Sequence, residues 1–264
     1  MSQSPASAEL IVKDLTIRFG GLTAVEGMTF EVNRGEVLSL IGPNGAGKTS
    51  AFNAITGYIQ ANGGSMTYQG TLLNGLKPNQ IAELGLVRTF QKTSVFMGQT
   101  VLDNVLHGLH LVSKQRPLAI IFGLPSVARE EMELAAEAHR ILGFVGLSGR
   151  ADWAASSLPY GELRLLEVAI ALAAKPKLLL LDEPVSGMNP SETASFMKIL
   201  AEIRKLDITV LLVEHDMKMV MGVSDRVVCL NQGKIIATGS PAEIQGNPEV
   251  IRAYLGERYV RAQG

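Results

Sequence analysis

The sequence predicts an α/β fold whose core is a mostly parallel sheet, with an antiparallel β subdomain near the N-terminus and an inserted helical subdomain. Three observations lead to this prediction. Apolar strand patterns at 36–41, 177–181 and 208–213 occur in a chain that also has helical patterns, which is typical of a parallel sheet. Alternating residues at 9–32 indicate short antiparallel strands. Residues 92–174 change to the apolar spacing of helices.

The composition suits one main core with an inserted or appended lobe. The chain has 264 residues, of which 47 % are apolar, so a full core is available. Lys and Arg together number 24 against 25 for Asp and Glu, which gives no sign of a nucleic-acid-binding surface. The single cysteine, Cys229, excludes a disulfide within the chain and suits a reducing compartment.

Neither a signal peptide nor a membrane span is expected from the sequence. The first ten residues lack a basic region and an apolar region of the signal-peptide kind. The longest mostly apolar run, 117–128, contains two prolines and is shorter than the roughly 20 residues that a spanning helix needs.

Turn and cap residues mark the ends of several later elements. Asn189, Pro190 and Glu192 fit the N-cap, N1 and N3 positions of a helix that continues through 196–203. A hairpin is predicted at 226–238. A last helix follows Asn247, which we expect to cap it.

The segment GPNGAGKT at 42–49 matches the pattern of a phosphate-binding loop between a strand and a helix. Its glycines allow several backbone N–H groups to point at one anion, and the helix N-terminus adds its dipole. Lys48 would reach the β- and γ-phosphates, and the Thr49 hydroxyl would ligate Mg²⁺. The alternative is an ordinary glycine-rich turn. The candidate phosphate-contacting residues are Gly42, Pro43, Asn44, Gly45, Ala46, Gly47, Lys48, Thr49 and the following Ser50.

Two carboxylates and a histidine follow the apolar strands of the same predicted sheet. KLLLLDEP at 177–184 ends in Asp182, which can hold Mg²⁺ through water, and Glu183, which can act as general base on a water. ITVLLVEHD leads to His215, whose imidazole could hydrogen-bond a γ-phosphate or the attacking water. The alternatives are a surface acid pair that caps a turn and a structural histidine.

Six motifs in one order make the sequence resemble the ATP-binding subunits of ABC transporters. They are GPNGAGKT, the glutamine of VRTFQ, LPYGE, LLLLDEP, SGMNP and the histidine of VEHD. The resemblance implies a P-loop NTPase cassette that binds ATP and Mg²⁺. It also implies that Phe19 stacks on the adenine, although a buried strand aromatic is the alternative. Gln91 would ligate Mg²⁺ and sense a membrane partner, and the alternative is a polar loop residue.

LPYGE at 158–162 occupies the position of the family's signature motif. The resemblance implies that two cassettes face head to tail, so that Tyr160, Gly161 and Glu162 complete an ATP site on the partner chain. The sequence departs from the common motif at Pro159, which offers neither a hydroxyl nor an N–H. Glu162 replaces a glutamine and can only accept hydrogen bonds.

The closest resemblance is to cassettes of branched-chain and other hydrophobic amino-acid importers. IRFGGLTAV, LPYGE, SGMNP and the tail AYLGE carry it. It implies a peripheral ATPase at the cytoplasmic face of the inner membrane, partnered by a second cassette, a multi-spanning permease and indirectly a solute-binding protein. We expect one ATPase domain over 8–258. Its parts are a core at 8–91 and 175–240, a helical subdomain at 92–174 and a C-terminal helix at 241–258.

Other functions remain open at this point. A lipopolysaccharide-export cassette has a similar tail. A soluble P-loop kinase would leave the signature and histidine motifs unexplained. A non-transport ABC protein usually carries paired cassettes or long coiled coils, for which 264 residues leave no room.

Overall fold

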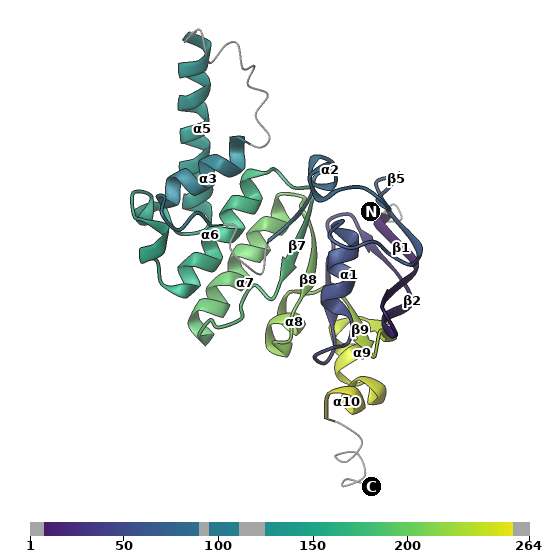
Figure 1. Cartoon of the computed structure of the whole chain (residues 1–264). Coiled ribbons are helices and arrows are strands. Elements are labelled where there is room, and N and C mark those ends of the chain that lie inside the picture. Colours follow the sequence, from purple (N-terminus) through teal and green to yellow (C-terminus); the bar gives the residue numbers. More distant parts are fainter. Residues whose placement is uncertain (1–7, 90–94, 111–124, 256–264) are drawn as a thin grey trace, which may run out of the picture. The chain divides into compact units, whose positions relative to one another are not determined.

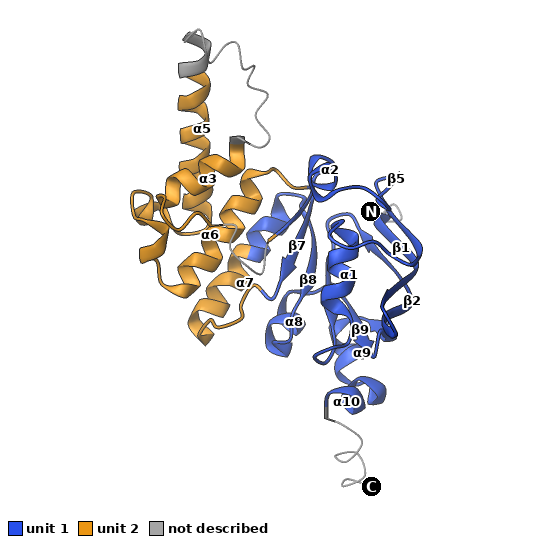
Figure 2. Ribbon diagram, in the orientation of Figure 1, with its two compact units in different colours: residues 1–88, 177–183, 200–264 blue, residues 89–176, 184–199 orange. Residues whose placement is uncertain are grey.

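The computed structural model describes residues 8–89, 95–110 and 125–255. The chain divides into two compact units (Figure 2). The first unit comprises Met1–Arg88, Lys177–Glu183 and Leu200–Gly264, and the second comprises Thr89–Pro176 and Pro184–Ile199. The phosphate loop, Asp182, Glu183 and His215 therefore belong to the first unit, and LPYGE belongs to the second.

An antiparallel sheet forms the N-terminal part of the first unit. Its strands are β1 (Ala8–Phe19), β2 (Leu22–Asn33), β4 (Gly63–Tyr68) and β5 (Thr71–Leu72), in the order β2-β1-β4-β5. The predicted antiparallel strands are confirmed, but their predicted shortness is wrong. β1 and β2 each run for 12 residues, because register shifts along their pairing absorb the irregular positions without ending either strand.

A second, six-stranded sheet confirms the predicted parallel core. Its strands are β3 (Val37–Ile41), β6 (Leu86–Arg88), β7 (Leu178–Asp182), β8 (Thr209–Val213), β9 (Arg226–Asn231) and β10 (Lys234–Gly239). Their order is β10-β9-β3-β8-β7-β6, and all pairs are parallel except β9–β10. Every residue of β3, β7 and β8 is buried, which explains their continuous apolar sequences.

Helix α1 (Lys48–Ile55) joins the two sheets of the first unit into one core. Phe52 and Ile55 are fully buried and belong to the same apolar cluster as Leu10 of β1 and Leu180 of β7. Figure 1 shows α1 between the antiparallel strands and the parallel sheet. The helices α2 (Pro78–Glu83), α8 (Met217–Val223), α9 (Pro241–Gln245) and α10 (Pro248–Leu255) complete the unit.

The second unit is helical, as predicted for most of its length. It contains α3 (Val101–His110), α5 (Pro125–Phe144), α6 (Tyr160–Ala173) and two short 3-10 turns at Ser148–Arg150 and Ala155–Ser157. α7 (Pro190–Lys205) is divided at Ile199 between the units. Among the described residues, no helix is long and apolar enough to cross a membrane.

The predicted caps of the last two long helices are confirmed. Asn189 Oδ1 accepts the backbone N–H groups of Ser191 at 2.9 Å and Glu192 at 3.0 Å, and Glu192 Oε2 accepts the Asn189 N–H at 2.8 Å. Asn247 Oδ1 similarly accepts the N–H of Glu249 at 2.8 Å. The Asn189–Glu192 pair is reciprocal, and both caps satisfy N–H groups that have no partner within the helix.

We predict that Asn189→Ala lowers the free energy of unfolding by about 1 kcal/mol, because two N–H groups at the start of α7 lose their acceptor. Asn189→Asp keeps an acceptor and is the matched control. Urea denaturation followed by circular dichroism measures both variants. An alanine variant as stable as wild type would show that the cap contributes nothing.

Candidate active site

The loop between β3 and α1 is held by close backbone contacts that only glycine permits. Gly47 has φ 104°, and a Cβ there would lie 2.4 Å from the carbonyl oxygen of Ala24 in β2. A Cβ at Gly42 would lie 2.2 Å from the carbonyl oxygen of Leu230 in β9. Gly233, in the β9–β10 turn, donates its N–H to the Ala46 carbonyl at 3.0 Å. The loop is thus fixed from both sheets of the unit.

The N-terminus of α1 leaves backbone N–H groups available to an anion. Gly47 is the N-cap and provides no side-chain cap. The first i to i−4 bond of the helix runs from Ala51 N to Gly47 O at 2.9 Å. The N–H groups of Lys48, Thr49 and Ser50 precede that bond, so they form the positive end of the helix dipole.

Lys48 is turned onto the loop that precedes it. Its Nζ donates to the carbonyl oxygens of Gly42 at 2.7 Å and Pro43 at 3.1 Å. Burial lowers the pKa of the Lys48 ammonium, and the carboxylates of Glu183 and Asp182 partly oppose that effect. The charges of Glu183 and Asp182 therefore act on the Lys48 ammonium.

Asp182, the last residue of β7, is held by a cation that the sequence analysis missed. Arg88 Nη2 lies 2.7 Å from Asp182 Oδ2, and the two side chains are 7 % and 1 % exposed. Asp182 Oδ1 has no hydrogen-bond partner among the described residues. A buried carboxylate oxygen without a partner fits a site that holds a hydrated cation. The sequence did offer a signal for Arg88, because a charged residue directly after apolar residues, in LVRTFQ, is unusual unless it is paired.

Glu183 and His215 lie close to each other. Glu183 has φ 47°, an uncommon value for a residue with a side chain, and its N–H donates to the Val213 carbonyl at 2.9 Å. His215 follows β8 and places Nδ1 3.9 Å from Glu183 Oε1 and 3.8 Å from Glu214 Oε2. The His215 side chain is 56 % exposed, so it can turn toward a ligand.

A cavity of about 600 Å³ brings the phosphate loop, Phe19 and Glu183 together, whereas Asp182 and His215 are not among the residues that line it. The loop residues from Asn44 to Ser50 line it, together with Glu183 and the half-exposed ring of Phe19 at the end of β1. Gln232 and Gly233 of the β9–β10 turn also line it, which no sequence signal indicated. The lining residues are Phe19, Leu22, Thr23, Ala24, Asn44, Gly45, Ala46, Gly47, Lys48, Thr49, Ser50, Glu183, Gln232 and Gly233.

In the second unit, the LPYGE segment forms the start of α6. Pro159 is the N-cap with extended backbone, and no side chain caps the helix. Tyr160 is half exposed, and Arg164 Nη2 donates to its hydroxyl at 2.7 Å. Glu162 is bound by Arg150, with N–O distances of 3.0 Å and 3.3 Å. The first i to i−4 bond of α6 runs from Leu163 N to Pro159 O at 3.0 Å, so the N–H groups of Tyr160, Gly161 and Glu162 precede it, but the Glu162 side chain already has a cationic partner.

Glu192 lies directly beside Gly161. A Cβ at Gly161 would be 2.7 Å from Glu192 Oε1, and the other oxygen of that carboxylate accepts the Asn189 N–H. A larger residue at Gly161 would therefore crowd an acid of its own unit. Gln91 lies outside the described residues.

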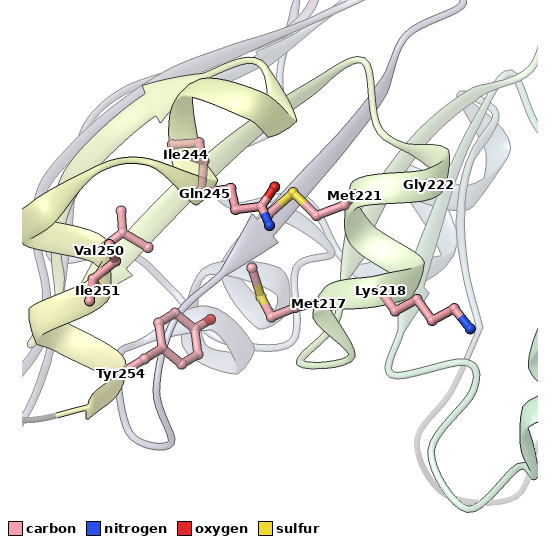
Figure 3. Close-up of a pocket in the computed structure, with 9 residues that line it drawn as sticks. All are labelled: Met217, Lys218, Met221, Gly222, Ile244, Gln245, Val250, Ile251 and Tyr254. Carbon is pink, nitrogen blue, oxygen red and sulfur yellow. The ribbon is translucent and has the colours of Figure 1, made fainter.

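A second cavity, of about 620 Å³, lies elsewhere in the first unit and contains none of the residues that the motifs predicted. Residues of α8, α9 and α10 line it. In Figure 3, Met217 and Tyr254 point toward each other across it, whereas Lys218 points away.

Comparison with known proteins agrees with this geometry. The sequence profile of the family described as "ABC transporter" matches residues 25–186. A second profile, "Branched-chain amino acid ATP-binding cassette transporter", matches residues 234–260. The high-affinity branched-chain amino acid transport ATP-binding protein LivG of Salmonella typhimurium is 45 % identical over 94 % of this chain and 98 % of its own. BraF of Pseudomonas aeruginosa, with the same description, is 44 % identical over the same shares.

Solved structures give the same result. The ADP conformation of MJ1267, an ATP-binding cassette of an ABC transporter, superimposes with a TM-score of 0.83 at 31 % identity, covering 95 % of this chain and 100 % of that one. CbiO1 from Clostridium perfringens, part of an ABC transporter complex, gives 0.78 at 26 % identity, with coverages of 96 % and 97 %.

The fold and the site define a nucleotide-binding ATPase of the P-loop class. The chain belongs to the ABC transporter family, as one of its ATP-binding cassettes. ATP hydrolysis is the activity of this family.

We predict that Gly47→Ala weakens nucleotide binding by roughly tenfold or more, which is about 1.4 kcal/mol, because the new Cβ collides with the Ala24 carbonyl and displaces the loop. Gly27→Ala is the matched control: Gly27 also has a positive φ, 62°, but nothing lies within 4 Å of its Cβ position. Calorimetry with ADP measures both. A Gly47→Ala variant that binds ADP as tightly as Gly27→Ala would show that the collision with the Ala24 carbonyl does not affect nucleotide binding.

Proposed function

We propose that this cassette hydrolyses ATP to energise the import of a small solute, a branched-chain or other hydrophobic amino acid, through a membrane transporter. The observation that carries the ATPase mechanism is the single cavity that the phosphate loop and Glu183 share. The amino-acid substrate rests on the 45 % identity to LivG and on the tail that matches the branched-chain profile.

The first unit would hold the nucleotide. The loop amides, the α1 N-terminus and Lys48 bind the phosphates, and Lys48 exchanges its two carbonyl acceptors for phosphate oxygens. Phe19, whose half-exposed ring lines the same cavity, would stack on the adenine.

Magnesium would be held jointly by the protein and the phosphates. The described residues contain no cluster of three or more acidic, histidine or cysteine side chains that could hold a metal alone. This fits Mg²⁺, which keeps much of its water and uses one or two protein ligands together with phosphate oxygens. Thr49, Gln91 and Asp182 are the proposed ligands, and the free Oδ1 of Asp182 supports its part. Bound Mg²⁺ would neutralise charge on the β- and γ-phosphates.

Glu183 would act as the general base, taking the proton of the attacking water. Its left-handed backbone directs the side chain away from the course of the strand, and the carboxylate reaches the cavity. His215 would hydrogen-bond the γ-phosphate or the water from beside Glu183.

The signature segment would act on a second cassette, identical or paralogous, in a head-to-tail dimer. The start of α6 supports this role. No side chain caps this helix N-terminus, so its backbone N–H groups could bind a phosphate of the partner's nucleotide. Tyr160, Gly161 and Glu162 would face the partner's nucleotide. The Arg150–Glu162 ion pair makes Glu162 a weaker acceptor for ribose hydroxyls than its sequence alone suggested.

The transporter partners are proposed from the family. They are multi-spanning permease subunits and, indirectly, a solute-binding protein, with the cassette peripheral at the cytoplasmic face of the inner membrane. We propose that residues 8–258 form one ATPase domain. Its parts are the core at 8–91 and 175–240, the helical subdomain at 92–174 and the C-terminal helix at 241–258. A lipopolysaccharide-export cassette is the runner-up within the family. Co-purification with a multi-spanning membrane protein separates a transport cassette from a soluble P-loop kinase or a non-transport ABC protein.

We predict that Glu183→Gln retains ATP binding but lowers turnover by roughly 10²–10⁴, the usual contribution of a general base. Because hydrolysis reopens the dimer, ATP and Mg²⁺ should trap this variant as a dimer on size-exclusion chromatography with light scattering. Glu202→Gln, an exposed acid of α7 paired with Lys205, is the control and should behave like wild type. Undiminished turnover in Glu183→Gln would remove its catalytic role.

A mixing experiment tests the proposed dimer. Gly161→Asp places a negative charge at the signature, and Lys48→Ala removes the phosphate-binding cation, so each chain alone should be inactive. In the mixed dimer, one composite site has both intact halves. We predict that mixing restores partial turnover, measured as phosphate release against total protein.

Two controls separate a contact across the dimer from crowding within the chain. Glu192→Ala removes the side chain beside Gly161, and Gly161→Asp in that background lacks the internal collision. If the double variant regained wild-type turnover on its own, the defect would lie within the chain and the trans role of the signature would be wrong.

A further inference from the structure

Arg88 stands out as a buried cation that the catalytic scheme above does not use. It is the last residue of β6 and pairs in register with Leu180 of β7. Leu180 and Asp182 are two residues apart on one strand, so their side chains share a face of the sheet. The register therefore directs the Arg88 side chain along the face on which Asp182 lies.

The guanidinium of Arg88 connects two motifs that are distant in the sequence. One nitrogen, Nη2, lies 2.7 Å from Asp182 Oδ2. The other, Nη1, donates to Asn53 Oδ1 at 2.7 Å and to Thr56 Oγ1 at 3.3 Å. Asn53 belongs to α1, whose first residue is Lys48, and Thr56 is the C-cap of that helix.

This arrangement gives one carboxylate oxygen of Asp182 a hydrogen-bond partner and leaves the other oxygen without one. Oδ2 accepts from Arg88, whereas Oδ1 is buried without a partner among the described residues. Lys48 does not compete for Asp182, because its Nζ donates to loop carbonyls. The rotation of the carboxylate is therefore set by Arg88, whose own position is set by α1.

We propose that Arg88 is a positioning residue for the metal: it holds Asp182 through Oδ2 so that Oδ1 is presented to the water shell of Mg²⁺, and it fixes Asp182 relative to α1. This inference rests on the proposed role of Asp182. A guanidinium suits the task because its planar fork bonds to two partners at fixed angles, which an ammonium cannot do. Outer partners of this kind typically change metal affinity by about 10–100-fold.

The test compares ADP affinity with Mg²⁺ and with EDTA, using calorimetry on the full chain. In Arg88→Met, which keeps length but loses the charge and the fork, affinity in EDTA should stay within about threefold of wild type. The tightening that Mg²⁺ produces should fall by roughly tenfold or more. Arg88→Lys keeps the charge without the fork and should lose part of the Mg²⁺ effect. The Mg²⁺ concentration for half-maximal ATPase activity should rise in the same order.

Arg226→Met is the matched control. Arg226 also forks around a carboxylate, with distances of 2.7 Å and 3.1 Å to Glu36, but at the opposite end of the parallel strands. The Arg226→Met variant should have a lower melting temperature, and Mg²⁺ should tighten its ADP binding as much as in wild type.

The outcomes separate the inference from the proposed function. If Mg²⁺ does not change the ADP affinity of the wild-type chain, both the proposed Mg²⁺ role of Asp182 and the positioning role of Arg88 are wrong. Two results would overturn only the role of Arg88. One is that Mg²⁺ tightens ADP binding to the same extent in wild type and Arg88→Met. The other is that Arg226→Met loses as much of this Mg²⁺ effect as Arg88→Met. If Arg88→Met does not fold, Arg88→Lys decides: a reduced Mg²⁺ effect supports the role and an unchanged one refutes it.

Discussion

The close approach of backbone to backbone around the phosphate loop is the constraint on which the rest of the site depends. At Gly47 the loop lies against the Ala24 carbonyl of β2, and at Gly42 against the Leu230 carbonyl of β9. One contact comes from the antiparallel sheet and the other from the parallel sheet. The shape of the loop therefore depends on both sheets, and the apolar core that holds them and α1 together supports the proposed binding site as well as stability.

Charge balance is the second constraint, because the site concentrates ionic groups beside fully buried strands. Burial disfavours the charged form of Lys48, while Asp182 and Glu183 favour it. Lys48 donates to loop carbonyls, and Asp182 accepts from Arg88 through one of its two oxygens. A triphosphate with Mg²⁺ would bring both signs of charge at once, so Lys48 could exchange its carbonyl acceptors for phosphate oxygens while Asp182 keeps Arg88, and no charge would be buried alone.

Local chemistry made much of this predictable. Continuous apolar runs revealed β3, β7 and β8, glycine spacing revealed the loop, and cap residues revealed the start of α7. What could not be predicted depends on register and on contacts between distant segments. Arg88 meets Asn53 and Asp182 only because β6 pairs with β7 in one particular register beside α1. The same holds for Gln232 in the cavity, whose position follows from where the β9–β10 turn packs.

The signature segment shows how an uncommon sequence can preserve a common physical device. Pro159 loses an N–H, yet the N-cap position tolerates proline because the helix begins after it. Gly161 is crowded by Glu192, whose carboxylate is fixed by the cap of α7. That acid beside a proposed phosphate site would oppose anion binding at this helix start. The N–H groups of α6 must then outweigh a nearby negative charge, which favours a role that operates only when a partner brings the Mg²⁺-neutralised phosphates to it.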